Sequence, residues 1–200
     1  MSEPSSRPTL GLRERKKART RAAIQAHALR LFREQGYDVT TVQQVIEEAE
    51  VSESTFFRYF PTKGDVVLSD DFDPLIVDAF RAQPPDLRPI QALRVAFRAV
   101  FDQLSGQEMS EQQERMHLIL SVPELRAALM DQFASAMRLL AVVLAERTGR
   151  QPEDTAVLTL AGAVVGAVVA LTLAVGDDPT ANFAARLDEA MAHLETGLEL

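Results

Sequence analysis

Apolar side chains recur with the period of an α-helix along most of this chain, whereas alternating, strand-like runs are short and rare. The first clear case is Ile24, Ala28, Leu31 and Phe32, whose spacing places all four side chains on one face of a helix. Gly36 follows, and glycine readily adopts the left-handed backbone that ends many helices. The pattern therefore predicts an all-α protein.

The stretch TTVQQVIEEAEVSESTFFRYFPTK, residues 40 to 63, contains two short amphipathic segments. Thr41 is placed to cap the first helix, with Gln44 three residues on to complete a capping box. Ser52 is placed to cap the second helix, which Pro61 ends. Helices of about nine residues are not stable alone, so neighbouring elements must hold them. Two such helices joined by a tight turn predict a helix-turn-helix, whose second helix protrudes into the major groove of DNA.

Proline and glycine divide the rest of the chain into further helices. We expect these helices near residues 63–82 with a kink at Pro74, 89–104, 110–121, 123–148, 152–175 and 179–198. Helix ends are expected at Gly106, Gly149 and Gly176. Asp178 followed by Pro179 predicts the start of the last helix.

Charge is divided between a basic first part and an acidic remainder. Residues 1–64 carry 11 basic and 8 acidic side chains, whereas residues 65–200 carry 10 basic and 21 acidic ones. A basic head on an acidic body favours contact of the head alone with a polyanion such as nucleic acid, although many such runs are only solvated surface. We expect a disordered tail over 1–10, a helix-turn-helix domain over 11–65 with its motif at about 40–60, and a helical body over 66–200.

Composition narrows the class of protein further. The chain has no cysteine, which excludes disulfides and thiolate metal sites. Its start, MSEPSSRPTL, has no apolar h-region, so we expect a cytoplasmic protein and no secretory signal. The histidines are scattered at His27, His117 and His193, and no GxSxG motif or phosphate loop occurs. We therefore expect no enzyme, no cofactor and no metal.

The segment LFREQGYDVTTVQQVIEEAEVSESTFFRYFPTKGDVV, preceded by a basic helix, resembles the DNA-binding domain of the TetR family of bacterial regulators. The resemblance covers residues 13–68, and the rest of the chain matches the family only in architecture. It implies an N-terminal three-helix helix-turn-helix domain followed by an antiparallel helical bundle for ligand binding and dimerisation. The implied function is that of a ligand-responsive regulator, most often a repressor, which binds a palindromic operator in double-stranded DNA as a dimer. A small effector would release it.

The family pattern assigns contacts with DNA to positions in and around the two short helices. It implies that Thr41 touches a phosphate, that Lys63 clamps another, and that residues 52–54 enter the groove. Hydroxyls and lysine suit phosphates, whereas Glu53 can accept a hydrogen bond from cytosine and an aromatic edge can pack on a thymine methyl. With the basic helix included, the expected DNA-contact residues are Arg15, Lys16, Arg19, Thr41, Ser52, Glu53, Ser54, Thr55, Phe57, Arg58, Tyr59 and Lys63.

Two residues depart from the family pattern. Glu50 stands where the turn usually has glycine, so a left-handed backbone there would cost about 1 kcal/mol. Phe57 stands where tyrosine is commoner, and it cannot donate a hydrogen bond to a phosphate. Phe56 and Phe60 are expected in the core, and the alternative role of Ser52 is that of a helix cap alone.

Residues 156–175, AVLTLAGAVVGAVVALTLAV, form an uncharged segment that is long enough to span a membrane, with Gly162 and Gly166 spaced as GxxxG. Alanine, glycine and threonine make up half of it, and no flanking Trp, Tyr or Lys anchors it. A buried helix at a dimer interface therefore fits better than a membrane span. The last helix adds a second apolar stripe, so the expected interface residues are Gly162, Gly166, Phe183, Leu187, Met191 and Leu194.

A third group of residues could line an effector pocket in the body. The bundles of this family typically enclose a small molecule, and flexible apolar side chains suit such a pocket, although each is more often plain core. The expected pocket residues are Phe97, Phe101, Met109, Met116, His117, Phe133 and Met137. An apolar or amphipathic effector, such as an acyl chain, is compatible with this set. The alternatives are a ligand-independent DNA-binding protein and a membrane-associated helical protein.

Overall fold

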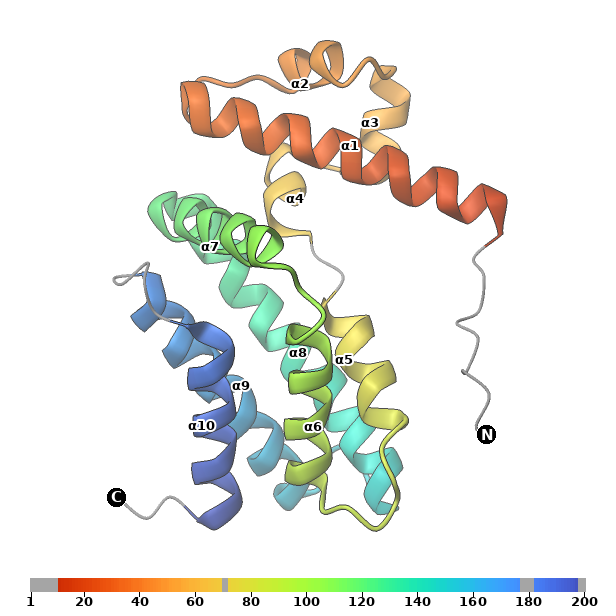
Figure 1. Cartoon of the computed structure of the whole chain (residues 1–200), viewed down its shortest axis with the longest axis vertical. Coiled ribbons are helices and arrows are strands. Elements are labelled where there is room, and N and C mark those ends of the chain that lie inside the picture. The colour runs from red at the N-terminus through yellow and green to blue at the C-terminus, as the bar shows by residue number, and fades with distance from the viewer. Residues whose placement is uncertain (1–10, 70–71, 177–181, 198–200) are drawn as a thin grey trace. The chain divides into compact units, whose positions relative to one another are not determined.

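The computed structural model describes residues 11–69, 72–176 and 182–197, and every secondary-structure element in these ranges is an α-helix (Figure 1). This result confirms the all-α prediction. The helices are α1 (Leu12–Gln35), α2 (Val42–Glu48), α3 (Glu53–Tyr59), α4 (Lys63–Leu68), α5 (Phe72–Arg81), α6 (Pro89–Phe101), α7 (Gly106–Ser121), α8 (Pro123–Thr148), α9 (Thr155–Gly176) and α10 (Phe183–Thr196).

The chain divides after Ser69 into two compact units, and the first unit contains α1 to α4. The long α1 packs against α2 and α4, and α2 packs against α3. Ile24 and Ala28 of α1 are fully buried in this unit, as are Phe56 and Phe60, which confirms their expected place in the core. The seven-residue helices α2 and α3 are therefore held by packing, as their length requires.

The helix α4 belongs to the first unit, so the division falls four residues after the expected boundary at residue 65. The side-chain amide of Gln25 in α1 donates hydrogen bonds to the carbonyl oxygens of Val66 and Ser69, each at 2.8 Å. Val66 and Val67 are fully buried. These contacts fix α4 against α1.

The helices α5 to α10 form the second unit, a bundle around one core. Within it, α6 lies between α5 and α10 and packs against both (Figure 1). The helix α9 packs against α8, α10 and α7, and α7 packs also against α8. Leu93 of α6, Leu144 of α8 and Val164 of α9 are among the side chains that meet in this core.

The expected single helix over residues 63–82 is wrong, because α4 ends at Leu68 and α5 begins at Phe72. Ser69 has an extended backbone, with ψ of 123°, and this conformation cannot continue a helix. Pro74 lies in the first turn of α5 and does not kink a longer helix. A proline is tolerated there because the first N–H groups of a helix have no partner within it.

The helix α7 begins at Gly106, four residues before the expected start, so Gly106 does not end a helix. Ser105 and Glu108 form a capping box: the Glu108 carboxylate accepts from the N–H of Ser105 at 2.8 Å, and the Ser105 hydroxyl accepts from the N–H of Glu108 at 3.2 Å. Gly149 does end α8, with a left-handed φ of 66°. The expected start of the last helix at Asp178 and Pro179 lies outside the described residues.

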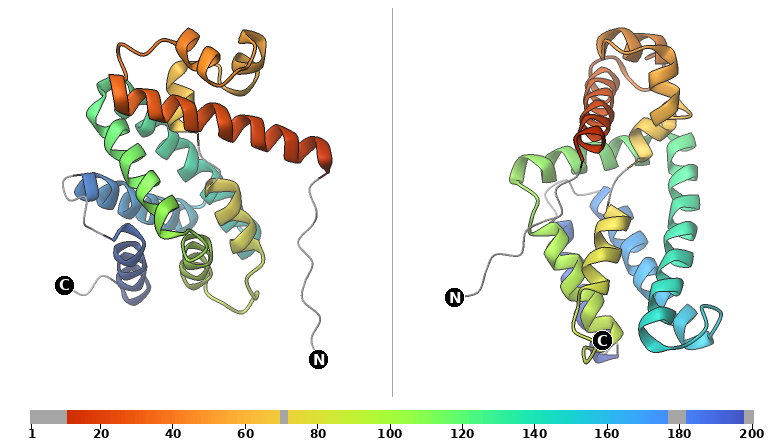
Figure 2. Two further views of the ribbon diagram at one scale, coloured as in Figure 1. Left: turned by 45° about the horizontal axis from the view of Figure 1, so that its top comes forward. Right: turned by 90° about the vertical axis from the view of Figure 1, so that its right-hand side faces the viewer.

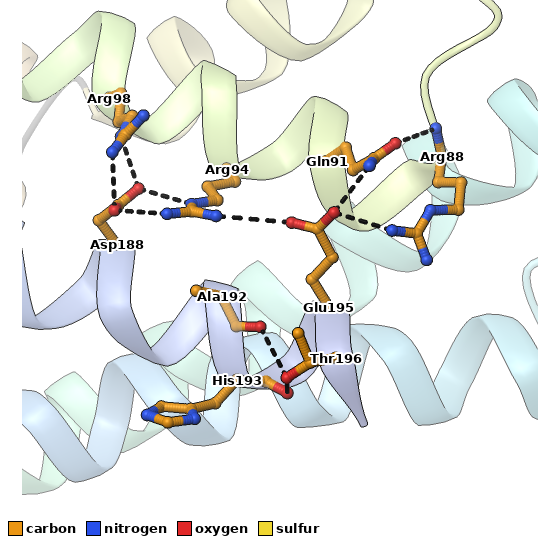
Figure 3. Close-up of polar contacts among 9 residues, drawn as sticks. All are labelled: Arg88, Gln91, Arg94, Arg98, Asp188, Ala192, His193, Glu195 and Thr196. Atoms are coloured by element: carbon orange, nitrogen blue, oxygen red, sulfur yellow. Dashed lines mark hydrogen bonds and ion pairs between the residues drawn. The ribbon is translucent and has the colours of Figure 1, made fainter. Parts of the chain in front are cut away.

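Charged side chains join α6 to α10 along one side (Figure 3). Asp188 accepts from Arg94 through two hydrogen bonds of 2.8 Å, and it also pairs with Arg98 at 2.6 Å. Glu195 accepts from Gln91 at 2.7 Å. The hydrogen bond from Arg94 is the main cause that holds the pKa of Asp188 below its usual range, and the hydrogen bond from Gln91 does the same for the pKa of Glu195. This network fixes α10 to the bundle.

The apolar stripe of α10 packs against the core of its own chain, so Leu187 and Met191 are not available to the expected dimer interface. Leu187 and Met191 are 1% and 0% exposed, respectively, within the second unit. Phe183 and Leu194 pack against the same core. The periodicity identified the apolar face of α10 correctly, but a core face and an interface face have the same pattern in a sequence.

Arg147, near the end of α8, holds the connection between α5 and α6. Its guanidinium donates hydrogen bonds to the carbonyl oxygens of Gln83 at 3.3 Å, Leu87 at 3.1 Å and Pro84. The same group lies 5.2 Å from the centroid of the Phe80 ring. One side chain therefore satisfies three carbonyls of a loop that contains two prolines.

Candidate nucleic-acid interface

The first helix of the motif begins with the predicted capping box. The Thr41 hydroxyl accepts a hydrogen bond from the N–H of Gln44 at 3.2 Å, and the Gln44 side chain accepts from the N–H of Thr41 at 2.7 Å. Thr41 is exposed. The cap therefore fixes the start of α2 while it leaves Thr41 at the surface, where a phosphate could approach it.

The turn between α2 and α3 contains a strained residue, Glu50. Its φ is 51°, and no other non-glycine residue in the described part of the chain has a positive φ. The N–H of Val51 bonds the carbonyl of Ile46, and the N–H of Glu50 bonds that of Glu47, each at 3.2 Å. This pair of bonds defines a Schellman motif, whose left-handed position is usually glycine. The expected cost of a non-glycine residue in this turn therefore applies at Glu50.

The second helix, α3, begins with a cluster of hydroxyl groups. The Ser52 hydroxyl accepts from the N–H of Thr55 at 3.1 Å and donates to the Thr55 hydroxyl at 2.8 Å. The Ser54 hydroxyl lies 3.1 Å from that of Ser52. Ser52 is thus a helix cap, and Ser52, Glu53 and Ser54 are all exposed at the start of α3. Small polar side chains at this end are those that a recognition helix presents to base edges.

The end of α3 presents aromatic and basic side chains on its outer side. Phe57 is 43% exposed, whereas its neighbour Phe56 is fully buried. Arg58 is exposed, and its guanidinium lies 5.2 Å from the centroid of the half-buried Tyr59 ring. An exposed phenylalanine has apolar surface available for a thymine methyl, and the arginine beside it can reach a phosphate or a base.

Lys63, at the start of α4, already has partners within the first unit. Its ammonium donates to the carbonyl oxygens of Tyr37 at 2.9 Å and Thr40 at 3.2 Å, and it lies 4.1 Å from the centroid of the Tyr37 ring. Lys63 therefore ties α4 to the connection between α1 and α2. The sequence does not predict this contact, because Tyr37 and Lys63 are 26 positions apart. A lysine ammonium has three donors, so a phosphate could take the third.

The expected basic residues of α1 are at the surface. Arg15, Lys16 and Arg19 are exposed, and they precede Ile24, the first buried residue of the helix. They therefore lie on the part of α1 that the core of the first unit does not cover.

Two of the expected pocket residues line a described groove, and the others have varied surroundings. Phe97 and Phe101 pack against the core of the bundle, and Phe101 contacts the rings of Phe72 and Phe183, with centroids at 5.7 and 5.8 Å. Met109 and Met116 of α7 are half-buried, and His117 is exposed. Phe133 and Met137 line a groove between α8 and α9.

That open groove has a volume of about 490 Å³ and an almost entirely apolar lining. It is lined by Phe133, Ala134, Met137, Gly162, Val165, Gly166, Val169, Ala170 and Leu173. Two expected pocket residues and both expected interface glycines thus share one surface. Further exposed apolar side chains on these helices include Met130, Leu139, Val142 and Leu158. The sequence does not predict α8 as part of this face, although apolar residues occur on all sides of this helix.

Both helices of the groove resemble membrane spans in length and composition. The helix α8, Pro123–Thr148, has a mean hydropathy of 1.5, and Thr155–Ala174 of α9 has a mean hydropathy of 2.4. Only 22% of either apolar window is buried in the chain. Exposed apolar surface of this kind marks a site of contact with a partner, a ligand or a membrane.

Comparisons with known proteins agree with this geometry. Residues 24–69 match the profile of the bacterial regulatory proteins of the tetR family, and residues 87–199 match the MftR C-terminal domain. The regulator TcmR of Streptomyces glaucescens is 36% identical over 161 residues, which cover 76% of this chain and 71% of TcmR. The regulator MftR of Mycobacterium tuberculosis is 27% identical over 157 residues, which cover 76% of this chain and 77% of MftR.

Solved structures show the same fold. Thermus thermophilus FadR in complex with lauroyl-CoA has a TM-score of 0.53 and 22% identity, over 90% of this chain and 95% of that one. A SmeT–triclosan complex has a TM-score of 0.59 and 19% identity, over 87% of this chain and 90% of that one. The chain belongs to the TetR family of bacterial transcriptional regulators. Its relatives are regulators and not enzymes, which confirms that expectation.

Proposed function

We propose that this protein is a ligand-responsive repressor that binds a palindromic operator as a cytoplasmic dimer and is released by a small apolar or amphipathic effector. The observation that carries this proposal is the capped helix α3, whose polar first turn is exposed while Phe56 anchors it in the core. Members of the family bind DNA and small-molecule effectors as dimers. A neighbour of similar fold, Thermus thermophilus FadR, is itself described as a repressor.

The proposed contacts with DNA are of two kinds: contacts with phosphates, which position the protein, and contacts with base edges, which read the sequence. Thr41 and Lys63 supply a hydroxyl and an ammonium, which suit phosphates and fix the register of the head on the duplex. Ser54 and Glu53 lie at the start of α3, where side chains reach base edges. Substitution of Ser54 by alanine should therefore change the preferred sequence, whereas substitution of Thr41 by valine should weaken all sequences alike.

Each variant loses one exposed hydroxyl of the same motif. Thr41→Val also removes the cap of α2, so circular dichroism must first show that its helices are intact. Binding to a pool of sequence variants of the selected site, measured in parallel at one salt concentration, scores both effects. An unchanged ranking of sequences for the Ser54 variant, or an altered ranking for the Thr41 variant, contradicts the division of roles.

The dimer interface in this proposal is the apolar face of α8 and α9. Gly166 is exposed in the groove, and a Cβ atom added there would meet no neighbouring side chain within 4 Å. A second copy can therefore approach the backbone of α9 closely. Two helices from each chain would form a four-helix interface, which places two heads on a palindrome.

The alternative is that a lipid bilayer covers the same apolar face. Asp131 and Arg138 are exposed on α8, and charged side chains are costly within hydrocarbon. The dimer therefore fits better. Light scattering on detergent-free protein distinguishes the two: a soluble dimer supports the proposal, whereas protein that pellets with membranes contradicts it.

In this proposal, the effector changes the distance between the two DNA-binding units of the dimer. SmeT and FadR are neighbours of similar fold that are seen with triclosan and lauroyl-CoA, both of which have large apolar parts. Acyl-CoA thioesters of graded chain length are thus the first probes to test. A coupling of about 1 to 3 kcal/mol would weaken operator binding by about 5- to 150-fold. Linkage requires that operator DNA weakens effector binding by the same factor, and an effector whose affinity is unchanged by DNA contradicts the mechanism.

A further inference from the structure

A cationic side chain is buried inside the second unit, on α7. Arg115 is 6% exposed, and it is the one charged residue that is buried in the described part of the chain. Charged side chains are rarely buried without a compensating group, because removal of a charge from water is costly. The burial of Arg115 therefore indicates a role that a surface arginine does not have.

Arg115 has more hydrogen-bond donors than one contact uses. The residue takes part in an interaction within the chain. A guanidinium has five N–H donors, however, and the Nε atom of Arg115 is buried with no acceptor among the described residues. A planar guanidinium in this state can still bind an anion through a further hydrogen bond.

The face of α7 that carries Arg115 packs against α8 and α9. Arg115 and Ile119, about one turn apart, are the buried residues of α7, and α7 packs against both of these helices. Val122 alone joins α7 to α8, so α7 lies at the end of the unit where α8 begins (Figure 1). The helix α9 starts near the other end of α8 and runs back toward α7, as Figure 2 also shows. The second half of α9 therefore approaches the face of α7 that carries Arg115.

The α7 end of the unit has buried apolar side chains of its own. Leu125 and Leu129 of α8 are 0% and 5% exposed, respectively. The next buried residue of α8 is Ala141, which belongs to the main core and lies twelve positions, or about 18 Å, further along the helix. The α7 end thus combines a buried cation with apolar side chains that are separate from the main core.

A second buried polar group comes from α9. Thr172 is 3% exposed and lies in the second half of the helix, on the same face as Ala161 and Val164 of the core. Its hydroxyl makes no hydrogen bond with a described residue, whereas Thr159 and Thr196 each donate to a carbonyl oxygen four residues earlier. A buried hydroxyl of this kind is available to a ligand.

From this arrangement we infer that the α7 end of the second unit binds an amphipathic acid, with Arg115 on its anionic group and Thr172 as a second hydrogen-bond partner. Carboxylates and phosphates suit a buried guanidinium because their hydrogen bonds with it are charge-assisted. The apolar side chains at the same end suit the apolar remainder of such a molecule. The inference rests on the proposed function, which it deepens by naming the chemical class of the effector. Neither residue belongs to the expected pocket set.

Calorimetric titration of the full-length protein tests this inference. The probes are octanoate, decanoate and dodecanoate, the alcohols of the same chain lengths, and lauroyl-CoA. An acid and its alcohol share one apolar chain, so the ratio of their affinities isolates the effect of the charge. Lauroyl-CoA has no free carboxylate, so it distinguishes a carboxylate from the phosphates of a CoA ester as the source of the anion.

The wild type should bind an acid, or lauroyl-CoA, about 10- to 150-fold more tightly than the alcohol of the same chain length, as expected for hydrogen bonds with a charged group. Arg115→Met should bind both alike. Arg115→Lys should lower the ratio and not abolish it, because an ammonium keeps the charge but lacks the planar fork. Thr172→Val should weaken binding of the anionic probe by about 2- to 10-fold.

The matched control is Arg126→Met, which removes an exposed arginine at the start of α8 and should leave the ratio unchanged. Circular dichroism checks that each variant keeps its helices, and Arg115→Lys still tests the inference if Arg115→Met does not fold. An unchanged ratio in either Arg115 variant overturns the inference. Equal affinity of the wild type for acids and alcohols, or no binding of any anionic probe, also overturns it. These titrations contain no DNA, so their outcome is separate from failure of the proposed function, in which the protein selects no duplex from a random library.

Discussion

Replacing Glu50 with glycine should stabilise the helix-turn-helix, because the turn after α2 holds this residue at φ of 51°. A left-handed backbone costs a non-glycine residue about 1–2 kcal/mol, and glycine adopts it freely. The greater freedom of glycine in the unfolded chain offsets about 0.5–1 kcal/mol of that gain. Removal of a negative charge at the C-terminal end of α2 adds about 0.3–1 kcal/mol. The net expectation is a gain of about 1 kcal/mol.

The chain provides a selective probe for this measurement. Its two tyrosines, Tyr37 and Tyr59, both lie in the first unit, and it has no tryptophan. Tyrosine fluorescence during urea unfolding therefore follows the first unit, while circular dichroism follows the whole chain. The free energy of unfolding of the first unit is obtained from the fluorescence transition.

Two control variants separate the effect of backbone strain on stability from the effect of the charge. Glu50→Gln removes the charge alone, whereas Glu50→Asn also supplies a residue that tolerates the left-handed conformation. The expected order of stability is glycine, then asparagine, then glutamine, with the wild type last. A glycine variant that is no more stable than the glutamine variant would refute the assignment of strain to this turn.

Three further predictions concern the second unit. Gly166→Leu should yield folded monomers, because a Cβ atom at this exposed position has open space around it, whereas the longer side chain blocks a second helix. A variant that remains dimeric in light scattering contradicts the proposed interface. Arg147→Ala should lower the free energy of unfolding by about 2 kcal/mol, because three carbonyl oxygens lose a charged donor. Urea unfolding followed by circular dichroism measures this loss, and an unchanged midpoint contradicts the prediction. The pKa of Asp188 is lowered in the folded protein, chiefly by the hydrogen bond from Arg94. The ionised carboxylate therefore stabilises the fold fully above the ordinary pKa of about 3.9, and this stabilisation is lost as the pH falls through the lowered pKa of the folded state. Urea midpoints below about pH 4 should fall less steeply for Asp188→Asn than for the wild type, and parallel curves contradict the linkage.

Local chemistry made much of the first unit predictable from the sequence. Thr41 and Gln44 are three positions apart, which is the geometry that a capping box requires, and the box forms. Glu50 stands at a turn position that favours glycine, and its backbone is left-handed, so the condition for the expected cost is met. In both cases, the determining contacts lie within a few residues, so a sequence contains all of the necessary information.

The predictions from sequence failed where a local pattern fits two different structures, or where a contact between residues far apart in the sequence determines the structure. Glycine often ends a helix, which predicts a helix end at Gly106, although Ser105 and Glu108 have the spacing of a capping box that starts a helix. The stripe on α10 has the periodicity of any apolar face, and only its packing places Met191 in the core and not at an interface. Lys63 bonds the carbonyl of Tyr37 across 26 positions, which no local pattern reveals.

The DNA sequence that the full-length protein selects from a random duplex library shows whether it reads an operator as a dimer. We expect a palindrome whose half-sites are centred one helical turn apart, roughly 10 base pairs or a small multiple of that spacing. We also expect Ser54→Ala to change the bases of the half-site and to preserve its spacing. Enrichment of no sequence, or of a site without two-fold symmetry, would contradict a dimeric regulator that reads its operator through α3.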